Sequence, residues 1–363
     1  MKEFPAAESQ SENGGDSNFD FSVEDVRDVL EDFRSLKVLV VGDTIFDRYS
    51  TVNVQGLTSK NMIISGRFLT EETQCGGALA VFRHVKQFVD QVRFVSLVGT
   101  ESWAQALIQE HVPEPADGIV RESGFTTIVK QRYVQPLSTG KELGKLFAVN
   151  YIDDQPPAVE MQDRILDAIR AEMGWSDIVL LLDFGHGMMQ PKLRQALQTE
   201  APFLALNCQT NSNNHGYNII SRQYSHADAF SLDEQELMLS AGHRHLNFSL
   251  ELNRLRESLR SRYAWLTRGA IETVGQREGP EQCVIPSLEN KVVDSVGAGD
   301  AFFSVAALAS VRRLPIGMAT LLGQLAGAQA VKIVGNARPI SKDRLLRAAA
   351  RWLQKSQKDR SSV

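Results

Sequence analysis

Short apolar runs alternate along the chain with longer stretches in which apolar residues recur every three or four positions. Short apolar runs are typical of strands buried on both faces, and the periodic stretches are typical of amphipathic helices. The pattern predicts buried strands at 37–43, 91–99, 177–185, 202–207, 227–233 and 263–269. It predicts helices between them at 22–33, 77–88, 158–173, 190–199, 233–241 and 252–263. This alternation predicts an α/β fold with a mostly parallel sheet flanked by helices.

Two stretches depart from this pattern. Residues 51–73 and 125–152 alternate apolar and polar positions without an intervening helix, which predicts a small antiparallel β lid that grows out of the parallel core. The apolar positions of the lid are costly to leave exposed, so we expect a homodimer that forms through it. Beyond Gly297 the chain is almost entirely helical in pattern, with helices predicted at 298–312, 315–334 and 341–356.

These elements predict a single domain over 22–357. Residues 1–21 are polar and acidic and have no apolar segment of the kind found in signal peptides, so they are expected to form a disordered tail. Residues 358–363 are expected to form a second polar tail.

The composition narrows the classes of function. The net charge of −5 gives no broad basic surface for nucleic acid, and no window is apolar enough to span a membrane. The three cysteines, Cys75, Cys208 and Cys283, are far apart and odd in number, which fits neither a disulfide framework nor a clustered metal site. We therefore expect a cytoplasmic protein with a small-molecule substrate.

Polar and glycine residues follow the predicted strands. Ligands of open parallel sheets bind at the carboxyl ends of the strands, so these residues outline a candidate site. They are Asp43, Asp47, Gly99, Asp183, Gly185, Gly187, Asn207, Asp233, Glu236, Thr267, Gly269 and the turn at 294–300.

The turn in DSVGAGDAFF, residues 294–303, carries the most specific chemistry. Glycines there allow backbone N–H groups to converge, and the helix that follows adds the positive end of its dipole, which together make an anion hole. Asp300 would lie beside that hole, where a carboxylate is placed to accept a proton from an attacking hydroxyl. The spacing alone supports equally well an Asp300 that only caps the helix.

The same stretch resembles the second signature of the ribokinase-like (PfkB) sugar kinases. Several further segments resemble the kinase half of bacterial heptose-phosphate kinase/adenylyltransferases, and the likeness runs from about Val38 to Val334. These segments are VLVVGDTIFDRY, CGGALAVFRHV, TIVKQRYV with LFAVNYID, and LLLDFGHG. The resemblance implies a ribokinase-like three-layer sandwich and an enzyme that uses ATP and Mg²⁺.

The resemblance also implies residue roles. Gly297, Ala298 and Gly299 would form the anion hole, and Asp300 would be the base. The residues expected to meet the sugar are Asp43, Asp47, Gly76 and Gly77. The residues expected on the nucleotide side are Asn207, Asp233, Thr267, Gly269 and Asp294, with Glu236 organising magnesium through water.

Two basic residues on a predicted lid strand leave two interpretations open. Lys130 and Arg132 are either ordinary surface charges or groups that reach a phosphate already present on the sugar. We count them among the substrate-binding candidates because the heptose-phosphate subgroup has basic residues at this place.

The chain departs from the family pattern at several positions. Ala80 and Asp233 each stand where the family usually has asparagine, and His186 replaces the lysine of a Lys-Gly pair. The stretch LNCQTN lacks the lysine of the usual Asp-Pro-Lys strand end.

The leading hypothesis is therefore an ATP-dependent phosphotransferase acting on a hydroxyl of a sugar or sugar phosphate, with heptose phosphates among the candidates. The alternative is a catalytically weak ribokinase-like scaffold that binds a sugar nucleotide or a partner protein. A dinucleotide-dependent oxidoreductase is disfavoured, because no G-x-G-x-x-G follows the first strand.

Overall fold

A nine-stranded sheet forms the centre of the computed structural model, which describes residues 21–112, 118–136, 143–153, 155–211, 214–289 and 291–361. The expected tails cover residues 1–21 and 358–363. Of these, residues 1–20 and 362–363 lie outside the described residues. The strands follow the order β13-β12-β11-β10-β9-β8-β1-β4-β5. Their bounds are β1 (Lys37–Gly42), β4 (Gln91–Val98), β5 (Ile119–Arg121), β8 (Ile178–Asp183), β9 (Leu204–Cys208), β10 (Ala229–Asp233), β11 (Tyr263–Thr267), β12 (Glu272–Arg277) and β13 (Gln282–Pro286).

All pairings from β5 to β11 are parallel, and the edge strands β12 and β13 are antiparallel to their neighbours. The inner strands are buried along their length, as β8 is at all its positions, because helices cover both faces. The predicted α/β class with a mostly parallel sheet is therefore confirmed.

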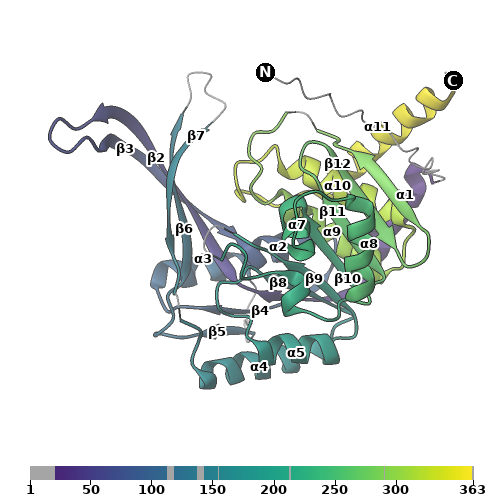
Figure 1. Cartoon of the computed structure of the whole chain (residues 1–363), viewed down its shortest axis with the longest axis horizontal. Coiled ribbons are helices and arrows are strands. Elements are labelled where there is room, and N and C mark those ends of the chain that lie inside the picture. The colour runs from purple at the N-terminus through teal and green to yellow at the C-terminus, as the bar shows by residue number, and fades with distance from the viewer. Residues whose placement is uncertain are drawn as a thin grey trace, which may run out of the picture.

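Two layers of helices enclose the sheet (Figure 1). One layer contains α4 (Val159–Met173), α5 (Pro191–Glu200), α6 (Ile220–Gln223), α7 (Glu234–Ala241) and α8 (Phe248–Ser258). The other contains α1 (Val23–Asp32), α2 (Gly77–Val85), α9 (Ala298–Val311), α10 (Ile316–Ala330) and α11 (Lys342–Ser361). The remaining helices are α3 (Ser102–His111) and the short 3₁₀ helix η1 (Phe33–Ser35).

Local sequence explains where several of these helices begin and how they pack. Ser22 and Asp25 form a capping box at the start of α1, whose apolar face is buried through Val26 and Leu30. Helix α9 packs on β8 and β10 and contacts α2 and α10 beside it, and ten of its residues after Asp300 are buried, from Ala301 to Ser310. A helix buried on all sides holds its N-terminus in a fixed place, and that place proves to be the candidate site.

The lid is a separate four-stranded sheet in the order β3-β2-β6-β7, which projects from the core at the left of Figure 1. Its strands are β2 (Thr44–Leu57), β3 (Ile64–Gly76), β6 (Ile128–Pro136) and β7 (Leu143–Tyr151). The two outer pairings are antiparallel, as expected, and the central pairing of β2 with β6 is parallel. Strand β2 starts seven residues before the expected lid boundary, so Asp47 lies on a lid strand.

The edge hairpin of β12 and β13, the helix α3 and the short strand β5 were not predicted from the sequence. Helix α2 ends at Val85, before its expected end, and α8 begins at Phe248, before its expected start. In the described part of the chain, no helix combines the length and the apolar character needed to cross a membrane.

Candidate active site

A cavity of about 560 Å³ opens at the carboxyl ends of β9, β10 and β11, beside the N-terminus of α9. Small-molecule sites are typically concave, few in number and of this size. The sequence-predicted residues that line it are Asn207, Asp233, Glu236, Thr267, Gly269, Gly297, Ala298, Gly299 and Asp300. The structure thus brings together the residues expected on the nucleotide side, except Asp294, with those of the expected anion hole.

The N-terminus of α9 is the place where the anion hole is expected. Gly297 is the N-cap and adopts a left-handed conformation with φ of +80°. A Cβ on Gly297 would lie 2.3 Å from Asn336 Oδ1, so a larger residue does not fit there. Gly299, in contrast, has open space where its Cβ would be. The N–H groups of a first helical turn have no partner within the helix, and the helix dipole favours a negative charge there.

The Asp300 carboxylate is buried, with 8% of the residue exposed. It accepts a hydrogen bond from Gln209, with 3.1 Å between Gln209 Nε2 and Asp300 Oδ1. Burial raises the pKa of Asp300 to about 6; the charge of Asp47 adds to this rise, while Gln209 and Lys130 oppose it. Among the described residues the Asp300 side chain makes no helix-capping hydrogen bond, and it lies in the first turn of α9, after the N-cap Gly297. A carboxylate with this pKa is suited to accept a proton near neutral pH.

Asp47 lies on the sugar side of the expected site and is held by two groups. Arg132 on β6 forms an ion pair with Asp47 Oδ1, and Asn336 Nδ2 donates to Asp47 Oδ2 over 3.1 Å. A Cβ on Gly76 would lie 2.2 Å from Asp47 Oδ2, so this glycine lets the chain pass close to the carboxylate. The charge of Arg132 is therefore already balanced by Asp47.

Asp43 follows β1 directly and is 1% exposed. Its Oδ2 accepts a hydrogen bond from the Phe184 N–H at 3.2 Å, whereas its Oδ1 has no partner among the described residues. Burial, and next the charge of Asp183, raise the pKa of Asp43 to about 7 against the opposing effect of backbone donors. Gly77 has φ of +57°, and its Cβ would lie 2.5 Å from the Asp43 carbonyl oxygen. A buried carboxylate oxygen without a donor is a candidate acceptor for a substrate hydroxyl.

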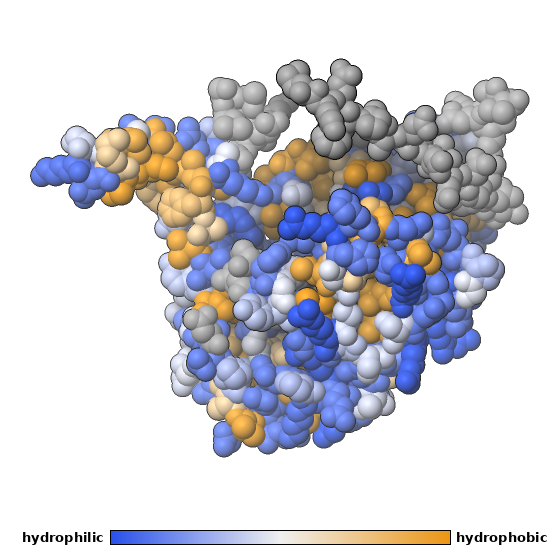
Figure 2. All heavy atoms as spheres, viewed as in Figure 1, coloured by the Kyte–Doolittle hydropathy of each residue, from blue (hydrophilic) through white to orange (hydrophobic). Residues whose placement is uncertain are grey.

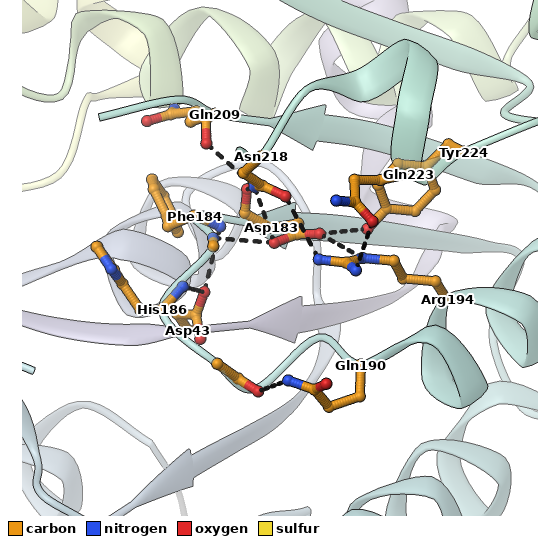
Figure 3. A network of polar contacts seen from close by, with 12 residues as sticks. Asp43, Asp183, Phe184, His186, Gln190, Arg194, Gln209, Asn218, Gln223 and Tyr224 are labelled. Atoms are coloured by element: carbon orange, nitrogen blue, oxygen red, sulfur yellow. Dashed lines mark hydrogen bonds and ion pairs between the residues drawn. The ribbon is translucent and has the colours of Figure 1, made fainter. Parts of the chain in front are cut away.

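Asp183 is the centre of a buried polar network (Figure 3). Its Oδ2 accepts hydrogen bonds from Arg194 Nε at 2.9 Å and from the Tyr224 hydroxyl at 2.7 Å. Its Oδ1 accepts from the Gly185 N–H at 2.9 Å and from Asn218 Nδ2 at 3.2 Å. With both oxygens satisfied, Asp183 supports the loop that follows β8.

Figure 3 also shows His186, which belongs to this loop and lies beside Asp43. His186 is buried, and its Nε2 has no hydrogen-bond partner among the described residues. Burial, together with the charge of Lys130, lowers the pKa of His186 to about 3. The histidine is therefore neutral at physiological pH and does not supply the positive charge of the lysine it replaces.

Lys130 lies on β6, in register with Asp47 on β2, and is half-buried. Burial lowers the pKa of Lys130, while the charges of Asp47, Asp300 and Asp43 act to raise it. Within the described chain, its ammonium group makes no hydrogen bond or ion pair. Lys130 is thus an unpaired cation close to three carboxylates of the candidate site.

Glu236 and Asp233 form a capping box at the start of α7. Glu236 accepts hydrogen bonds from the N–H groups of Asp233 at 2.9 Å and of Thr210 at 3.1 Å. Burial and the charge of Asp233 raise the pKa of Glu236 to about 8. No group of three or more Asp, Glu, His or Cys side chains in the described ranges surrounds a single point, so these residues do not form a complete metal cage.

Asp294 does not line the cavity. It accepts hydrogen bonds from the Tyr49 hydroxyl at 3.3 Å and from Lys145 Nζ at 3.0 Å, both on lid strands. The N–H groups of Val296 and Gly335 also donate to it, at 3.2 and 3.0 Å. Burial raises the pKa of Asp294, but these hydrogen bonds outweigh it and hold the pKa below its usual range. Asp294 therefore links the lid to the turn that leads into α9.

Three residues with polar contacts in the site were missed from the sequence. Gln209 contacts Asp300, Asn336 contacts Asp47, and Lys145 contacts Asp294. Gln209 follows a predicted strand, which was a signal available in the sequence. Asn336 and Lys145 had no such signal, because their partners are 289 and 149 residues away along the chain.

The chain is similar to curated proteins described as bifunctional protein HldE. It is 26% identical over 276 residues to the protein from Magnetococcus marinus, covering 74% of this chain and 55% of the relative. It is 26% identical over 323 residues to the one from Nitrosococcus oceani, covering 88% of this chain and 65% of the relative. The chain thus spans less than two thirds of the length of these relatives. No family model matches the chain.

Solved structures share the fold. Phosphofructokinase-2 from Escherichia coli in complex with potassium superposes with a TM-score of 0.67 at 11% identity, covering 87% of this chain and 99% of that one. Arabidopsis thaliana ribokinase complexed with ribose and ATP gives 0.65 at 18% identity, covering 86% and 98%. Ribokinase from Thermotoga maritima gives 0.63 at 17% identity, covering 86% and 99%. The predicted ribokinase-like fold is thereby confirmed.

Proposed function

We propose that this chain, with its ribokinase-like fold, is an ATP-dependent kinase that phosphorylates a hydroxyl group of a sugar or sugar phosphate. One observation carries the proposal. A buried carboxylate with a pKa of about 6, Asp300, lies in the first turn of α9, where that helix meets a cavity of about 560 Å³. A base beside an anion site is the arrangement that transfer of a phosphoryl group to a hydroxyl requires.

In the proposed reaction, Asp300 accepts the proton of the sugar hydroxyl as the hydroxyl oxygen attacks the γ-phosphorus of ATP. The bond between the γ-phosphorus and the oxygen that bridges it to the β-phosphate breaks, and ADP leaves. The N–H groups at the start of α9 and the helix dipole stabilise the charge on the transferred group. Gly299 leaves the space that a phosphate needs to approach the backbone.

Magnesium fits the chemistry of the cavity. Asp233, Glu236 and Asp300 all line it, and Mg²⁺ in phosphoryl-transfer sites is bound through one or two carboxylates, waters and the phosphates of the substrate. When bound, the ion would neutralise charge on the phosphates. Glu236 already accepts two backbone hydrogen bonds, so its role toward the ion would be through water.

The sugar would lie between Asp43, Asp47 and the lid. Asp43 Oδ1 is a buried acceptor without a donor, as a pocket that binds a hydroxyl would provide. Lys130, on β6 of the lid, is near these carboxylates and makes no ion pair among the described residues. It would bind a phosphate of the acceptor sugar or neutralise the transferred group, in place of the missing lysine of the strand end. The first of these roles requires a phosphorylated acceptor.

The lid would also form a homodimer. Large apolar side chains on it are exposed, among them Phe68 at 61% and Phe147 at 53%. Figure 2 shows apolar residues gathered along the projecting lid. Apolar surface of this kind on an exposed sheet is typical of an interaction site.

A substrate screen tests the proposal. Purified full-length protein would be incubated with ATP and Mg²⁺ and with a panel of sugars and sugar phosphates that includes heptose phosphates. We expect ADP release stimulated by one class of acceptor and lost in Asp300→Asn. Absence of acceptor-stimulated ADP release, together with no ATP binding by calorimetry, would leave the scaffold alternative.

A further inference from the structure

A second cavity of about 840 Å³ lies between α10, α11 and the segment that follows β13. Helix α11 packs against α10 (Figure 1), and the cavity runs along their boundary. Six of its lining residues are cations, and they come from both walls. They are Lys332, Arg338, Arg344, Arg347, Arg351 and Lys355. We call this space the basic cavity.

The cations of α11 form a stripe. Arg344, Arg347, Arg351 and Lys355 follow one another at intervals of three or four residues, which places them on one face of the helix. Like charges at this spacing repel each other and destabilise a helix. No carboxylate in the described ranges forms an ion pair with any of the four. Elsewhere exposed arginines are often paired, as Arg170 is with Glu200.

A concave wall of uncompensated cations favours an anionic ligand, because several positive charges then act on the same small volume. Arginine forks bind phosphate oxygens through two parallel hydrogen bonds. The cavity has the size of a small-molecule site. The ligand that fits best is a small molecule with several phosphate groups.

The basic cavity shares a wall with the candidate active site. Ser287, Leu288, Glu289 and Ala328 line both cavities. Glu289 forms an ion pair with Lys332, which belongs to the basic cavity. A phosphate bound there would compete with Glu289 for Lys332 and so change the charge and position of a residue that also faces the nucleotide side.

We propose that the basic cavity is a second site, which binds a small molecule with a chain of phosphates and thereby changes nucleotide binding in the first cavity. The chain of phosphates comes either from a nucleoside triphosphate or from a ligand without a base. Binding at this site does not depend on the proposed kinase activity, so the two proposals fail independently.

Calorimetry on the full-length protein with inorganic tripolyphosphate tests this proposal. The variant is Arg347→Gln/Arg351→Gln, and the matched control is Arg222→Gln/Arg244→Gln, which removes the same charge from exposed arginines outside the cavity. We expect the variant to lose a binding component by about tenfold or more in affinity, as loss of two charge-assisted contacts predicts. The control should bind like wild type.

The non-hydrolysable nucleotide AMP-PNP then distinguishes the two sources. AMP-PNP that binds the component dependent on Arg347 and Arg351 more tightly than tripolyphosphate assigns the site to a nucleoside triphosphate, and AMP-PNP that binds it more weakly assigns it to a phosphate chain without a base. Equal tripolyphosphate binding by wild type and Arg347→Gln/Arg351→Gln overturns the proposal. A second outcome also overturns it. If an oligothymidylate of twelve nucleotides binds through these arginines and tripolyphosphate does not bind, the surface is a binding site for nucleic acid.

Discussion

Gln209 donates a hydrogen bond from its side-chain amide to the Asp300 carboxylate, at 3.1 Å between Nε2 and Oδ1. The same Nε2 lies 2.7 Å from Asn207 Oδ1, so the amide is oriented by a residue of β9. A hydrogen bond to the charged form of a carboxyl lowers its pKa. In the proposed mechanism Gln209 is thus a positioning residue, and its hydrogen bond keeps Asp300 ionised to lower pH.

The pH profile of kcat/KM should therefore fall on the acid side near pH 6, the pKa of Asp300, because the base must be deprotonated. In Gln209→Leu the pKa should rise, and activity should already be lost at a higher pH. The measurement is kcat/KM from pH 5 to 9 for both proteins, with Gln198→Leu on α5 as the control. An acid limb that stays in place in Gln209→Leu would contradict this role.

Asp300→Asn should lower turnover by about 10² to 10⁴, which is the usual contribution of a general base. A carboxyl whose pKa is higher in the folded than in the unfolded state costs stability above that pKa, and asparagine removes the cost. The melting temperature at pH 7.5 should consequently be unchanged or higher, and ATP affinity should be kept. Turnover, thermal unfolding and calorimetry measure these three quantities. Retained turnover in a folded variant would rule out Asp300 as the base.

Lys130→Met should raise the KM for a phosphorylated acceptor by about tenfold, because a charge-assisted contact to phosphate is lost. Arg67→Met removes an exposed cation from β3 of the same lid and should leave the KM near wild type. The measurement is the KM and kcat of both variants in steady-state kinetics with the acceptor found in the screen. If instead kcat falls while the KM stays constant, Lys130 acts on the transferred group and not on the acceptor phosphate.

Two glycines of the turn should respond differently to alanine. Gly297→Ala should destabilise the protein by several °C, because the residue has φ of +80° and its Cβ would lie 2.3 Å from Asn336 Oδ1. Gly299→Ala has open space for its Cβ and should keep the wild-type melting temperature. Its methyl group would stand at the anion site, so ATP affinity should fall. Unchanged ATP affinity in Gly299→Ala would argue against phosphate binding at this turn.

The lid should mediate self-association. Ile64→Ser/Phe68→Ser removes two exposed apolar side chains and should shift the protein toward monomer in sedimentation experiments. Val159→Ser is the control, since Val159 is 65% exposed on α4, away from the lid. A wild-type protein that remains monomeric at high concentration would contradict a lid-mediated dimer.

The parallel core was predictable because its strands are short apolar runs buried on both faces, as β8 and β1 are. The edge hairpin of β12 and β13 was not, since ETVGQR mixes polar residues with a glycine over six residues and QCVIP has only five residues and ends in proline. The parallel pairing of β2 with β6 joins segments far apart in sequence, and periodicity carries no information on such partners.

The candidate site also has a part that the sequence predicts and a part that it does not. The glycine turn at 297–299 and the start of α9 were predictable because their signal lies in consecutive residues. The contacts of Asp47 with Arg132 and Asn336 were not, because these partners are 85 and 289 residues away. Arg132 was expected to be either a surface charge or a phosphate ligand; its pairing with Asp47 is an outcome that only the folded arrangement of β2 and β6 reveals.

The contacts of Asp294 restrict how the lid can move relative to the core. Its carboxylate is tied on one side to Tyr49 and Lys145 of the lid, and on the other to the backbone of Val296 and Gly335. Any hinge motion that swings β2 and β7 away from the core has to break these ties or drag the 294–297 turn with it. Asn336 adds two further ties, to Asp47 on β2 and to Gln74 on β3, so opening the lid would disturb the turn that precedes α9 and the segment that follows α10 together.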